Sequence, residues 1–324
     1  MNFIFYGFRH GHIFDFFRLA QRTSGVNILA AIEDDPQANI ATAKALGISL
    51  ESGTYEAWLK NPAVDAVAIG DAYGRRGCAV IAALRHGKHV ISDKPLCIDL
   101  QELTQIRQLT NAENLQIGCL LDLRYTPAAL RAKALFASGK LGAVKNISFT
   151  GQHCIDYAHR PSWYFEPNMH GGTINDIAIH GIDLITFLTG HRIRTVHCAR
   201  TWNSFAYLHP DFRDCAAFMA QTDGGAGVLA DISYSAPSQV FSMPTYWNFH
   251  FWCEKGLVTF CYTGNDVTVY QESIPEAQIL PGIFPESNIL EDFLQQIHTA
   301  DHRQTESVLN ATETALTVQR AANQ

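Results

Sequence analysis

The stretch Asn2-Phe-Ile-Phe-Tyr-Gly-Phe-Arg-His-Gly-His-Ile13 decides the fold. Its apolar, aromatic-rich start followed by glycine predicts a buried strand that ends in a tight turn. The same order, an apolar run and then a helical pattern, recurs until about residue 120. Strand-first alternation of this kind is typical of a parallel sheet that carries helices on its faces. We therefore predict an α/β fold for this part of the chain.

Strands and helices alternate along this part. The strands are expected at Asn2–Tyr6, Val26–Ile32, Ala66–Ile69, His89–Ser92 and Gln116–Cys119. The helices are expected at Phe14–Arg22, Pro36–Ala45, Tyr55–Leu59, Ala79–Arg85 and Leu100–Leu109. Such a doubly wound sheet binds its ligand beyond the carboxyl ends of the strands.

The first turn is compared with the Rossmann dinucleotide fingerprint, which reads G-x-G-x-x-G. Gly7 occupies the first glycine position, whereas Arg9 and His12 occupy the other two. Gly11 offers another point of close backbone approach. The candidate cofactor-binding residues of the turn are Gly7, Phe8, Arg9, His10, Gly11, His12 and Ile13. A tight turn with only a structural role is the alternative.

An acidic run, Glu33-Asp34-Asp35, lies about 20 residues beyond this turn. An acid at this position binds the adenosine ribose in the fingerprint. Three acids would repel a 2′-phosphate, so NAD is favoured over NADP, although Arg9 could offset part of that repulsion. Glu33 and Asp34 are assigned to the cofactor.

A lysine stands at a ligand-facing strand end in His86-Gly-Lys-His-Val-Ile-Ser-Asp-Lys-Pro-Leu96. The proline that follows restricts Lys94 to extended geometry, which would aim its ammonium into the cleft. A solvated lysine before a turn is the alternative.

The stretch Gly171–Gly190 reads as one helix with a glycine at each end. Asp176, His180 and Asp183 follow one row at i, i+4 and i+7, so a carboxylate and an imidazole project the same way. Such a pair can hold and move a proton. In the alternative, the residues of this helix have structural roles. Thr173 caps the helix, Asp176 interacts favourably with the helix dipole, and His180 is a histidine whose hydrogen bonds are made within the protein.

Composition narrows the class of protein. Apolar residues make up 47% and charged residues 17% of 324 residues, and no apolar run approaches the length that spans a bilayer. The net charge of −7 argues against nucleic acid as a partner. Eight cysteines without a C-x-x-C pair favour reduced thiols and a cytoplasmic location, and the N-terminus reads as a strand, not a signal peptide.

The chain length favours two domains, and the pattern changes after Cys119. We expect domains at 1–121 and 122–324. A helix at Pro127–Ser138, a strand at Val144–Thr150 and a polar-aromatic loop from Gln152 to His170 open the second domain, and hairpin signals then predict a large, mainly antiparallel sheet. Its further strands are expected at Val196–Trp202, Ala216–Gln221, Gly227–Tyr234, Asn248–Cys253, Leu257–Tyr262 and Val267–Tyr270, and its last helices at Asn288–Thr299 and Gln304–Ala322.

The polar-aromatic loop suits a polyhydroxylated ligand. Its candidate substrate-binding residues are His153, Tyr157 and Trp163. A mobile surface loop is the alternative.

Several short motifs together resemble the Gfo/Idh/MocA oxidoreductases, the glucose–fructose oxidoreductase and inositol dehydrogenase group. They are Asp93-Lys94-Pro95 after Gly87-Lys-His-Val, Asp65-Ala-Val-Ala-Ile, Leu123-Arg-Tyr125, Gly139-Lys-Leu-Gly142, and Gly171-Gly172 before Asp176-x-x-x-His180. Asp93 stands where that family usually has glutamate.

The resemblance implies catalysis by Lys94, Asp176 and His180, which come from different domains and meet at the nicotinamide. His180 would take a hydroxyl proton as hydride leaves the same carbon, Asp176 would orient the imidazole, and Lys94 would stabilise the alkoxide. It further implies that Asp71 lies at the cofactor and that Arg124 and Tyr125 lie in the substrate cleft. A sugar, inositol or related polyol is the implied substrate, and one sheet face is implied to bury the interface of a dimer or tetramer.

Other functions stay open at this stage. Some members of the family keep NAD bound and epimerise or cleave sugars. From other classes come a regulator that senses the cofactor without turnover, and a metal-dependent hydrolase or isomerase that uses Asp176, His180 and some of His153, His159 or His170. No metal-binding spacing is present, so no metal site is predicted.

Overall fold

The structure is a computed structural model that describes residues 1–51, 53–239, 242–243, 246–272 and 274–324. The chain forms two compact units. Unit 1 comprises Met1–Leu120, Pro161–Gly171 and Ser287–Thr312, and unit 2 comprises Leu121–Arg160, Gly172–Glu286 and Glu313–Gln324. The first boundary between the units lies beside the division expected at residues 121 and 122. Two later segments return to unit 1, which no local sequence signal had indicated.

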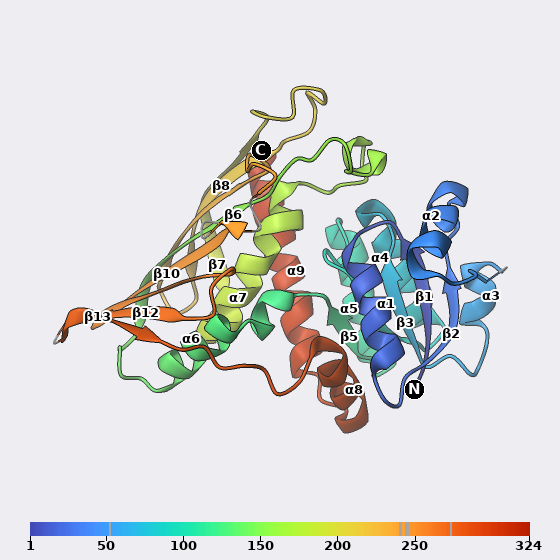
Figure 1. The fold of residues 1–324 in the computed structure, drawn as a ribbon, viewed down its shortest axis with the longest axis horizontal. Coiled ribbons are helices and arrows are strands. Elements are labelled where there is room, and N and C mark those ends of the chain that lie inside the picture. The colour runs from blue at the N-terminus through green and yellow to red at the C-terminus, as the bar shows by residue number, and fades with distance from the viewer. Residues whose placement is uncertain (52, 240–241, 244–245, 273) are drawn as a thin grey trace. The chain divides into compact units, whose positions relative to one another are not determined.

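Unit 1 contains, among its described residues, a five-stranded parallel sheet in the order β2-β1-β3-β4-β5 (Figure 1). Its strands are β1 (Asn2–Phe8), β2 (Asn27–Ile32), β3 (Ala66–Gly70), β4 (His89–Ser92) and β5 (Ile117–Cys119). The predicted parallel sheet is therefore confirmed, and β1 runs on into the glycine turn.

The helices of unit 1 follow the predicted alternation. They are α1 (His12–Arg22), α2 (Pro36–Leu46), α3 (Tyr55–Leu59), α4 (Tyr73–Arg85), α5 (Leu100–Ala112), α8 (Ile289–Thr299) and the first part of α9 (Arg303–Ala322). The start of α4 was predicted wrongly, at Ala79. Gly74 and Gly77 weaken helix propensity before that residue, but the Gly74 N–H donates to the Met169 carbonyl, and packing outweighs propensity.

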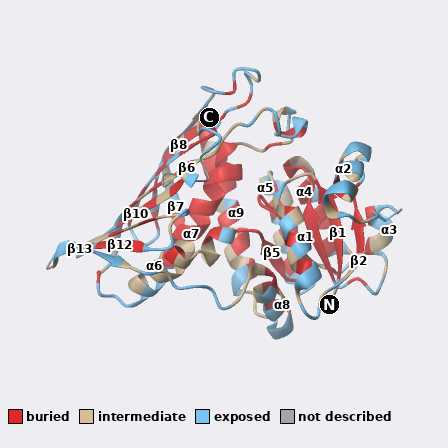
Figure 2. Ribbon diagram, viewed as in Figure 1, coloured by how far each residue is buried: buried red, intermediate tan, exposed pale blue. Residues whose placement is uncertain are grey.

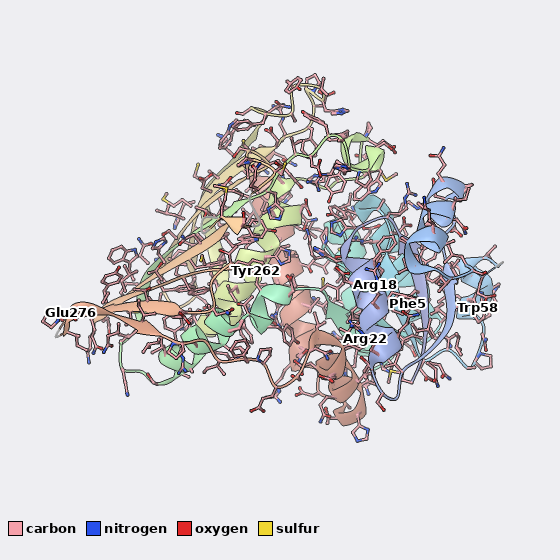
Figure 3. The ribbon with its side chains drawn as sticks, viewed as in Figure 1. Phe5, Arg18, Arg22, Trp58, Tyr262 and Glu276 are labelled. Carbon is pink, nitrogen blue, oxygen red and sulfur yellow. The ribbon has the colours of Figure 1, made fainter. Side chains whose placement is uncertain are left out.

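The two faces of the parallel sheet follow from the alternation of side chains along β1. Phe3 and Phe5 are fully buried in the cluster that includes α1 and α8. Tyr6 points the other way, and its ring stacks on Tyr55 of α3 at 3.9 Å between centroids. The outer side of α1 carries the exposed Arg18 and Arg22 (Figure 3).

Helix α8 comes late in the chain and completes the core of unit 1. Leu290 and Phe293 are buried in the same cluster as β1, and the Phe293 ring lies 6.5 Å from that of Phe3. The Gln296 amide donates to the Gln116 side chain beside β5 at 2.7 Å. The N-terminal sheet therefore depends on a segment that is about 290 residues distant in sequence.

Unit 2 contains, among its described residues, an eight-stranded sheet in the order β13-β12-β11-β10-β6-β9-β8-β7 (Figure 1). The strands are β6 (Val144–Gln152), β7 (Ile193–Trp202), β8 (Cys215–Thr222), β9 (Gly227–Ser233), β10 (Trp247–Cys253), β11 (Gly256–Cys261), β12 (Val267–Gln271) and β13 (Ile274–Leu280). Only the β6–β9 pair is parallel among these described strands. This confirms the predicted, mainly antiparallel sheet.

Strand β13 was not predicted, because its sequence lacks an apolar alternation. It contains Pro275 and is largely exposed at the sheet edge (Figure 2). Proline is tolerated in a strand at such an edge. Pairing with β12 therefore makes this segment a strand.

Helices cover one face of this sheet. They are the 3₁₀ turn η1 (Asp122–Tyr125), α6 (Pro127–Ala137), the π-helical turn η3 (Ile174–Ala178), α7 (Ile179–Thr189) and the end of α9. Gly181 of α7 faces Phe149 of β6, and a Cβ there would lie 2.3 Å from the Phe149 ring. A glycine at this point lets the helix backbone approach the sheet.

The predicted helix Gly171–Gly190 needs correction at its start. Regular structure begins at Ile174 with a π-helical turn, and α7 follows from Ile179. The Thr173 hydroxyl does not cap the helix, because it donates to the Arg213 carbonyl. The predicted stop is confirmed, since Gly190 has φ of 75° in the left-handed region.

Gly181→Ala tests the close approach of α7 to β6. Alanine favours helix by about 1 kcal/mol over glycine, yet we expect a net loss of about 1–3 kcal/mol in the free energy of unfolding because the buried Phe149 ring has to shift. Urea denaturation followed by circular dichroism measures it.

Gly77→Ala in α4 is the matched control. The atoms nearest to a Cβ there belong to the end of the flexible Glu102 side chain. This variant should unfold with little change or with a small gain in stability. Equal losses in the two variants would contradict the packing argument.

Candidate active site

The glycine turn of unit 1 is held tightly to its neighbours. Gly7 has φ of 74°, and a Cβ there would lie 2.6 Å from the Asp71 side chain. The Arg9 N–H donates to the Gly70 carbonyl at 3.0 Å. Phe8 and Ile13 point into the hydrophobic core, so only their backbone can face a ligand. The space beside Gly11 is open, because a Cβ at this residue would have no neighbouring atom within 4 Å.

The three acids after β2 have separate roles. Glu33 is buried and accepts from the Phe8 and Asp35 N–H groups at 2.6 and 2.9 Å, while its burial raises its pKa. Asp35 caps α2 through the Ala38 N–H. The Asp34 side chain is 44% exposed and accepts from the Tyr6 hydroxyl. Asp34 is therefore the most accessible of the three.

Asp71, assigned to the cofactor from the sequence, lies buried behind the turn. Its carboxylate pairs with Arg75 at 3.0 Å and accepts from the Ala72 N–H. Burial raises its pKa, and the Arg75 guanidinium opposes that shift. The described contacts therefore give Asp71 a part in shaping the turn.

Asp93 is a fully buried carboxylate at the end of β4. Its Oδ2 accepts from His10 Nδ1 at 2.6 Å and from Arg76 at 3.3 Å. Its Oδ1 accepts from His12 Nδ1 at 3.0 Å and from the Lys94 N–H at 2.7 Å. Despite burial, His10 and Arg76 hold the pKa of Asp93 well below its usual range. The residue connects the glycine turn, α4 and the Lys94 segment.

Lys94 is buried, and its ammonium lies 5.7 Å from the centre of the Tyr73 ring. The Tyr73 and Tyr164 hydroxyls share a hydrogen bond of 2.6 Å. Trp163, a predicted substrate residue, is 2% exposed and its indole N–H donates to the Arg9 carbonyl. The part of the polar-aromatic loop that carries Trp163 and Tyr164 therefore belongs to unit 1 and includes the short 3₁₀ turn Ser162–Phe165.

These features fit a dinucleotide. Helix α1 has Gly11 at its N-cap and no side chain caps it. An uncapped helix N-terminus after a strand favours a phosphate. An accessible carboxylate, Asp34, lies where the ribose is expected. Gly7, Arg9, Gly11, His12 and Asp34 would hold the group.

In unit 2, Asp176 lies in the π-helical turn and is 2% exposed. The Tyr234 hydroxyl, just beyond β9, donates to its Oδ2. A π-turn inserted before an α-helix is frequent at functional sites. A buried, hydrogen-bonded carboxylate in such a turn is suited to act on a ligand hydroxyl.

His180 lies on α7 and is 5% exposed. Its Nδ1 lies 3.6 Å from the Asp122 Oδ1, and the Asp122 side chain is 55% exposed. The indole of Trp247 in β10 stands edge-on to the imidazole at 5.8 Å between centroids. A carboxylate at Nδ1 favours the tautomer and the orientation in which Nε2 accepts a proton.

Aromatic residues surround this pair. The Tyr246 hydroxyl lies 3.3 Å from His153 Nε2, and the His153 ring lies 5.8 Å from that of Trp247. Burial raises the pKa of Tyr246, with the neighbouring Tyr262 (Figure 3) adding to the shift. His153 therefore belongs to the same cluster as Asp176 and His180.

Arg124, assigned to the substrate cleft from the sequence, pairs with a buried carboxylate of unit 2. Its guanidinium forms two hydrogen bonds to the buried Asp183, through Nε at 2.6 Å and through a second nitrogen. Asp183 therefore joins α7 to η1 and does not extend the Asp176–His180 row. Tyr125 lies in the same 3₁₀ turn as Arg124.

Two other residues of the loop, Tyr157 and His159, have neighbours within unit 2. The Tyr157 hydroxyl donates to the Phe205 carbonyl at 3.2 Å, and its ring packs on Tyr207. His159 is exposed and pairs with Asp156.

Sequence reasoning missed Asp122 and Tyr234. Asp122 lies beside the Leu123-Arg-Tyr125 motif, and that position was the one available signal. Tyr234 is brought to Asp176 by the pairing of β9 with β6 and β8, which no local pattern reveals.

A metal centre of the kind considered from sequence is not supported. Among the described residues, the one group of histidine, cysteine and acidic donors close enough to share an ion is His10, His12 and Asp93. It contains none of the ligands required by the metal-dependent alternative.

Two family models match the chain. Residues 5–119 match the model of an oxidoreductase family with an NAD-binding Rossmann fold, and residues 129–259 match the GFO/IDH/MocA C-terminal domain. The fold and site thus define an NAD-binding oxidoreductase. The chain belongs to the Gfo/Idh/MocA family, and the predicted cofactor, NAD, is confirmed at this level.

Two curated relatives are named as dehydrogenases. The chain is 27% identical over 175 residues to levoglucosan dehydrogenase of Pseudarthrobacter phenanthrenivorans, covering 52% of this chain and 44% of that protein. It is 28% identical over 189 residues to scyllo-inositol 2-dehydrogenase (NAD⁺) of Bacillus subtilis, covering 57% and 53%. The chain spans about half the length of these relatives.

Solved structures share the fold over the whole chain. A putative oxidoreductase from Erwinia carotovora atroseptica has a TM-score of 0.88 at 20% identity and covers 100% of this chain and 99% of its own. Levoglucosan dehydrogenase in complex with NADH and levoglucosan has a TM-score of 0.82 at 18% identity, with 100% and 97% covered. Among the described residues, none of the helices combines the length and the apolar content needed to cross a bilayer.

Arg124→Met tests whether Arg124 is structural. Asp183 is 1% exposed, so removing its partner leaves a buried carboxylate unpaired. We expect unfolding to become easier by about 3–5 kcal/mol, measured by urea denaturation. In the control, Arg124→Met combined with Asp183→Leu should recover much of that loss. A stable Arg124→Met protein with only weakened substrate binding would instead support the original assignment to the cleft.

Proposed function

We propose that this protein is an NAD-dependent dehydrogenase that oxidises a CH–OH group of a sugar, an inositol or a related polyol. The observation that carries this proposal is the pairing of a buried imidazole, His180, with the Asp122 carboxylate on an NAD-binding oxidoreductase chain. The polar and aromatic neighbours of His180 suit a polyhydroxylated ligand. The named activities of the relatives are of the same class.

The proton chemistry is assigned to His180 and its carboxylate neighbours. His180 takes the proton of the substrate hydroxyl at Nε2, while Asp122 at Nδ1 orients the ring and stabilises the imidazolium. Asp176, fixed by Tyr234, is the second carboxylate of the site and was expected to orient the same imidazole. The nicotinamide, when bound, supplies the hydride acceptor.

Lys94 is assigned to the negative charge that develops on the substrate oxygen. Its backbone is held from both sides, since Asp93 accepts from its N–H and Arg76 donates to its carbonyl. A buried ammonium on a fixed backbone stabilises charge without reorganisation. Tyr125, His153, Tyr157 and Trp163 stay the proposed substrate residues.

Titration with NAD and NADP, followed by a polyol screen, tests the function. The purified protein is first checked for co-purified cofactor by its absorbance, because retained NAD would favour an epimerase or glycosidase of the same family. Calorimetry then gives the affinities, and NADH absorbance reports oxidation of sugars, inositols and sugar acids. Failure to bind either dinucleotide would overturn the proposal, whereas binding without turnover would favour a regulator.

His180→Ala should lower kcat by about 10²–10⁴-fold, the usual contribution of a general base. Its affinity for NAD should change less than about twofold, since His180 is assigned to the substrate proton. Steady-state kinetics and calorimetry measure the two quantities. The control is His197→Ala in the outer strand β7, which should keep full activity. Loss of NAD binding without any change in the chemical step would contradict the role.

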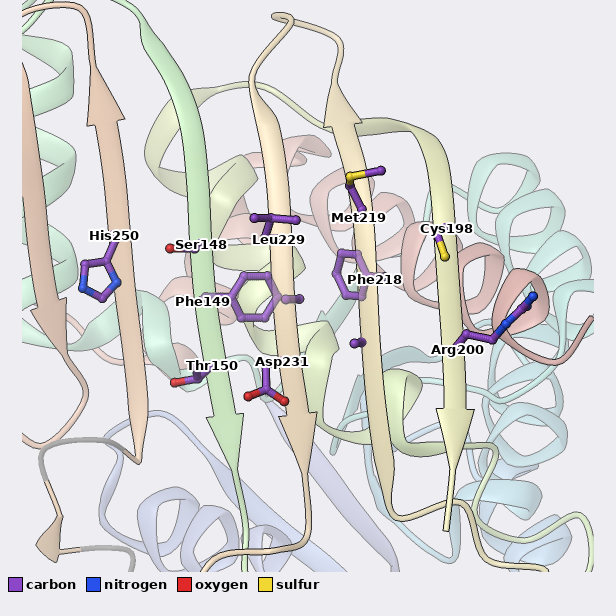
Figure 4. A pocket seen from close by; sticks show the side chains of 12 residues that line it. Ser148, Phe149, Thr150, Cys198, Arg200, Phe218, Met219, Leu229, Asp231 and His250 are labelled. Carbon is purple, nitrogen blue, oxygen red and sulfur yellow. The ribbon is translucent and has the colours of Figure 1, made fainter. Parts of the chain in front are cut away.

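We further propose that the open face of the eight-stranded sheet pairs with a second copy of the chain, in a dimer or within a tetramer. Large apolar side chains lie exposed on neighbouring strands: Met219 and Leu229 are each 47% exposed, and Trp252 is 51% exposed. A hollow of about 500 Å³ on this face is lined also by Ser148, Asp231 and His250. Figure 4 shows these side chains. Exposed apolar patches of this kind mark interfaces.

Leu229→Asp should therefore shift the protein toward monomer, because two copies of the charge would be buried at a symmetric interface. Light scattering coupled to size-exclusion chromatography measures the mass. Leu208→Asp, in an exposed loop where Leu208 is 58% exposed, serves as the control. A wild-type protein that is already monomeric at micromolar concentration would refute the interface.

A cytoplasmic location is part of the same proposal. The eight cysteines are thiols and not disulfides in the structure, and burial raises the pKa of Cys215 to about 12 and of Cys253 to about 11. Unreactive reduced thiols are usual in a reducing compartment.

A further inference from the structure

A histidine stands where the dinucleotide fingerprint has its third glycine, and a second histidine lies beside it on the same carboxylate. His12 takes the glycine position, at the first residue of α1. Its Nδ1 lies 3.0 Å from Asp93 Oδ1, and His10 Nδ1 lies 2.6 Å from the other oxygen of Asp93. Because a carboxylate only accepts, both Nδ1 atoms carry their hydrogens. Asp93 therefore holds both rings through their Nδ1 atoms.

The two imidazoles differ in their access to a ligand. The His10 side chain is 13% exposed and its ring packs between Tyr73 and Tyr164, so its contacts lie in the protein interior. Burial lowers the pKa of His10 to about 4, which keeps it neutral. The His12 side chain is 44% exposed. His12 is therefore the member of the cluster that can reach a bound molecule.

The charges around Asp93 favour an anion over a metal ion. Arg76 lies 3.3 Å from Asp93 Oδ2 and is fully buried, and Lys94 is the next residue along the chain. A divalent cation at His10, His12 and Asp93 would be repelled by both cations and by the positive end of α1. A phosphate would be attracted by the same groups.

We propose that His12, positioned by Asp93, binds the pyrophosphate of the dinucleotide as an imidazolium. The inference rests on the NAD binding of the proposed function and adds a residue-level reason for the altered turn. Asp93 accepts the Nδ1–H bond and stabilises the positive ring, while Nε2–H donates to a phosphate oxygen. A charged donor thus takes the role that the fingerprint assigns to close backbone approach.

If His12 binds the pyrophosphate as an imidazolium, the affinity for that ligand has to depend on pH. The charged and titratable groups near it are His10 and Asp93 in the cluster, Arg76 and Lys94 beside Asp93, and Asp15 on α1. Asp93 stays ionised through the range in which histidine titrates, because despite burial its pKa is held well below its usual range by His10 and Arg76. Affinity for a pyrophosphate ligand should therefore fall by about tenfold as pH rises from about 6 to 8, through the range in which histidine titrates.

The test compares ADP-ribose, which carries the pyrophosphate, with adenosine, which does not, by calorimetry at both pH values. In His12→Gln we expect ADP-ribose to bind about tenfold more weakly at the lower pH, with the pH dependence lost. Adenosine should bind equally to both proteins at both pH values. His86→Gln is the control, because His86 lies at the far end of α4 and bonds the Ala82 carbonyl.

Asp93→Asn provides the second variant. It keeps an acceptor for the imidazole but removes the charge, so the fall in ADP-ribose affinity should move to lower pH, which a packing defect alone would not cause. If Asp93→Asn unfolds, His12→Gln still decides the matter, since its half-exposed side chain can change without disturbing the core.

The outcomes separate this inference from the proposed function. Unchanged, pH-independent ADP-ribose affinity in His12→Gln would overturn the role of His12 and leave the dehydrogenase intact. Zn²⁺ binding to the wild type that is lost in His12→Gln, together with unchanged ADP-ribose affinity, would make the cluster a metal site and also overturn it. Absence of NAD and ADP-ribose binding in the wild type would remove both proposals.

Discussion

The ligand edge of the N-terminal unit depends on one buried carboxylate. Asp93 follows β4 and accepts hydrogen bonds from the glycine turn after β1, from Arg76 of α4 and from the backbone of Lys94. A buried charge is stable only when its neighbours supply donors and opposite charge, so these elements have to meet at one point. The cofactor turn and the proposed catalytic lysine are thereby positioned by the same residue.

In the second unit, a close contact between a helix and the sheet positions the residues of the candidate site. Gly181 lets α7 approach the Phe149 ring of β6, and the π-helical turn before α7 carries Asp176 to the Tyr234 hydroxyl. Such π-helical turns are frequent at functional sites. Asp176 pairs with Tyr234, while Asp122 of η1 lies beside His180.

Some side chains of the candidate site have partners that the sequence pattern could not show. Arg124, assigned to the substrate cleft from the sequence, pairs with the buried carboxylate of Asp183. Trp163 lies in a loop rich in polar and aromatic residues, yet its ring is buried and its indole bonds the Arg9 carbonyl. In each case a residue far away in the sequence pairs with a polar or aromatic group of a type that is common at binding sites.

The sequence by itself determined the alternation of strands and helices, the mainly antiparallel second sheet, the family, and Lys94, Asp176 and His180 as the catalytic candidates. These follow from local periodicity and short motifs, which the neighbouring residues along the chain set. Only the tertiary structure decided that α8 completes the first core, that β13 is an edge strand, and that Asp122 and Asp93 stand beside the imidazoles. Such contacts join residues far apart in the chain, so their energies depend on distances that no local pattern encodes.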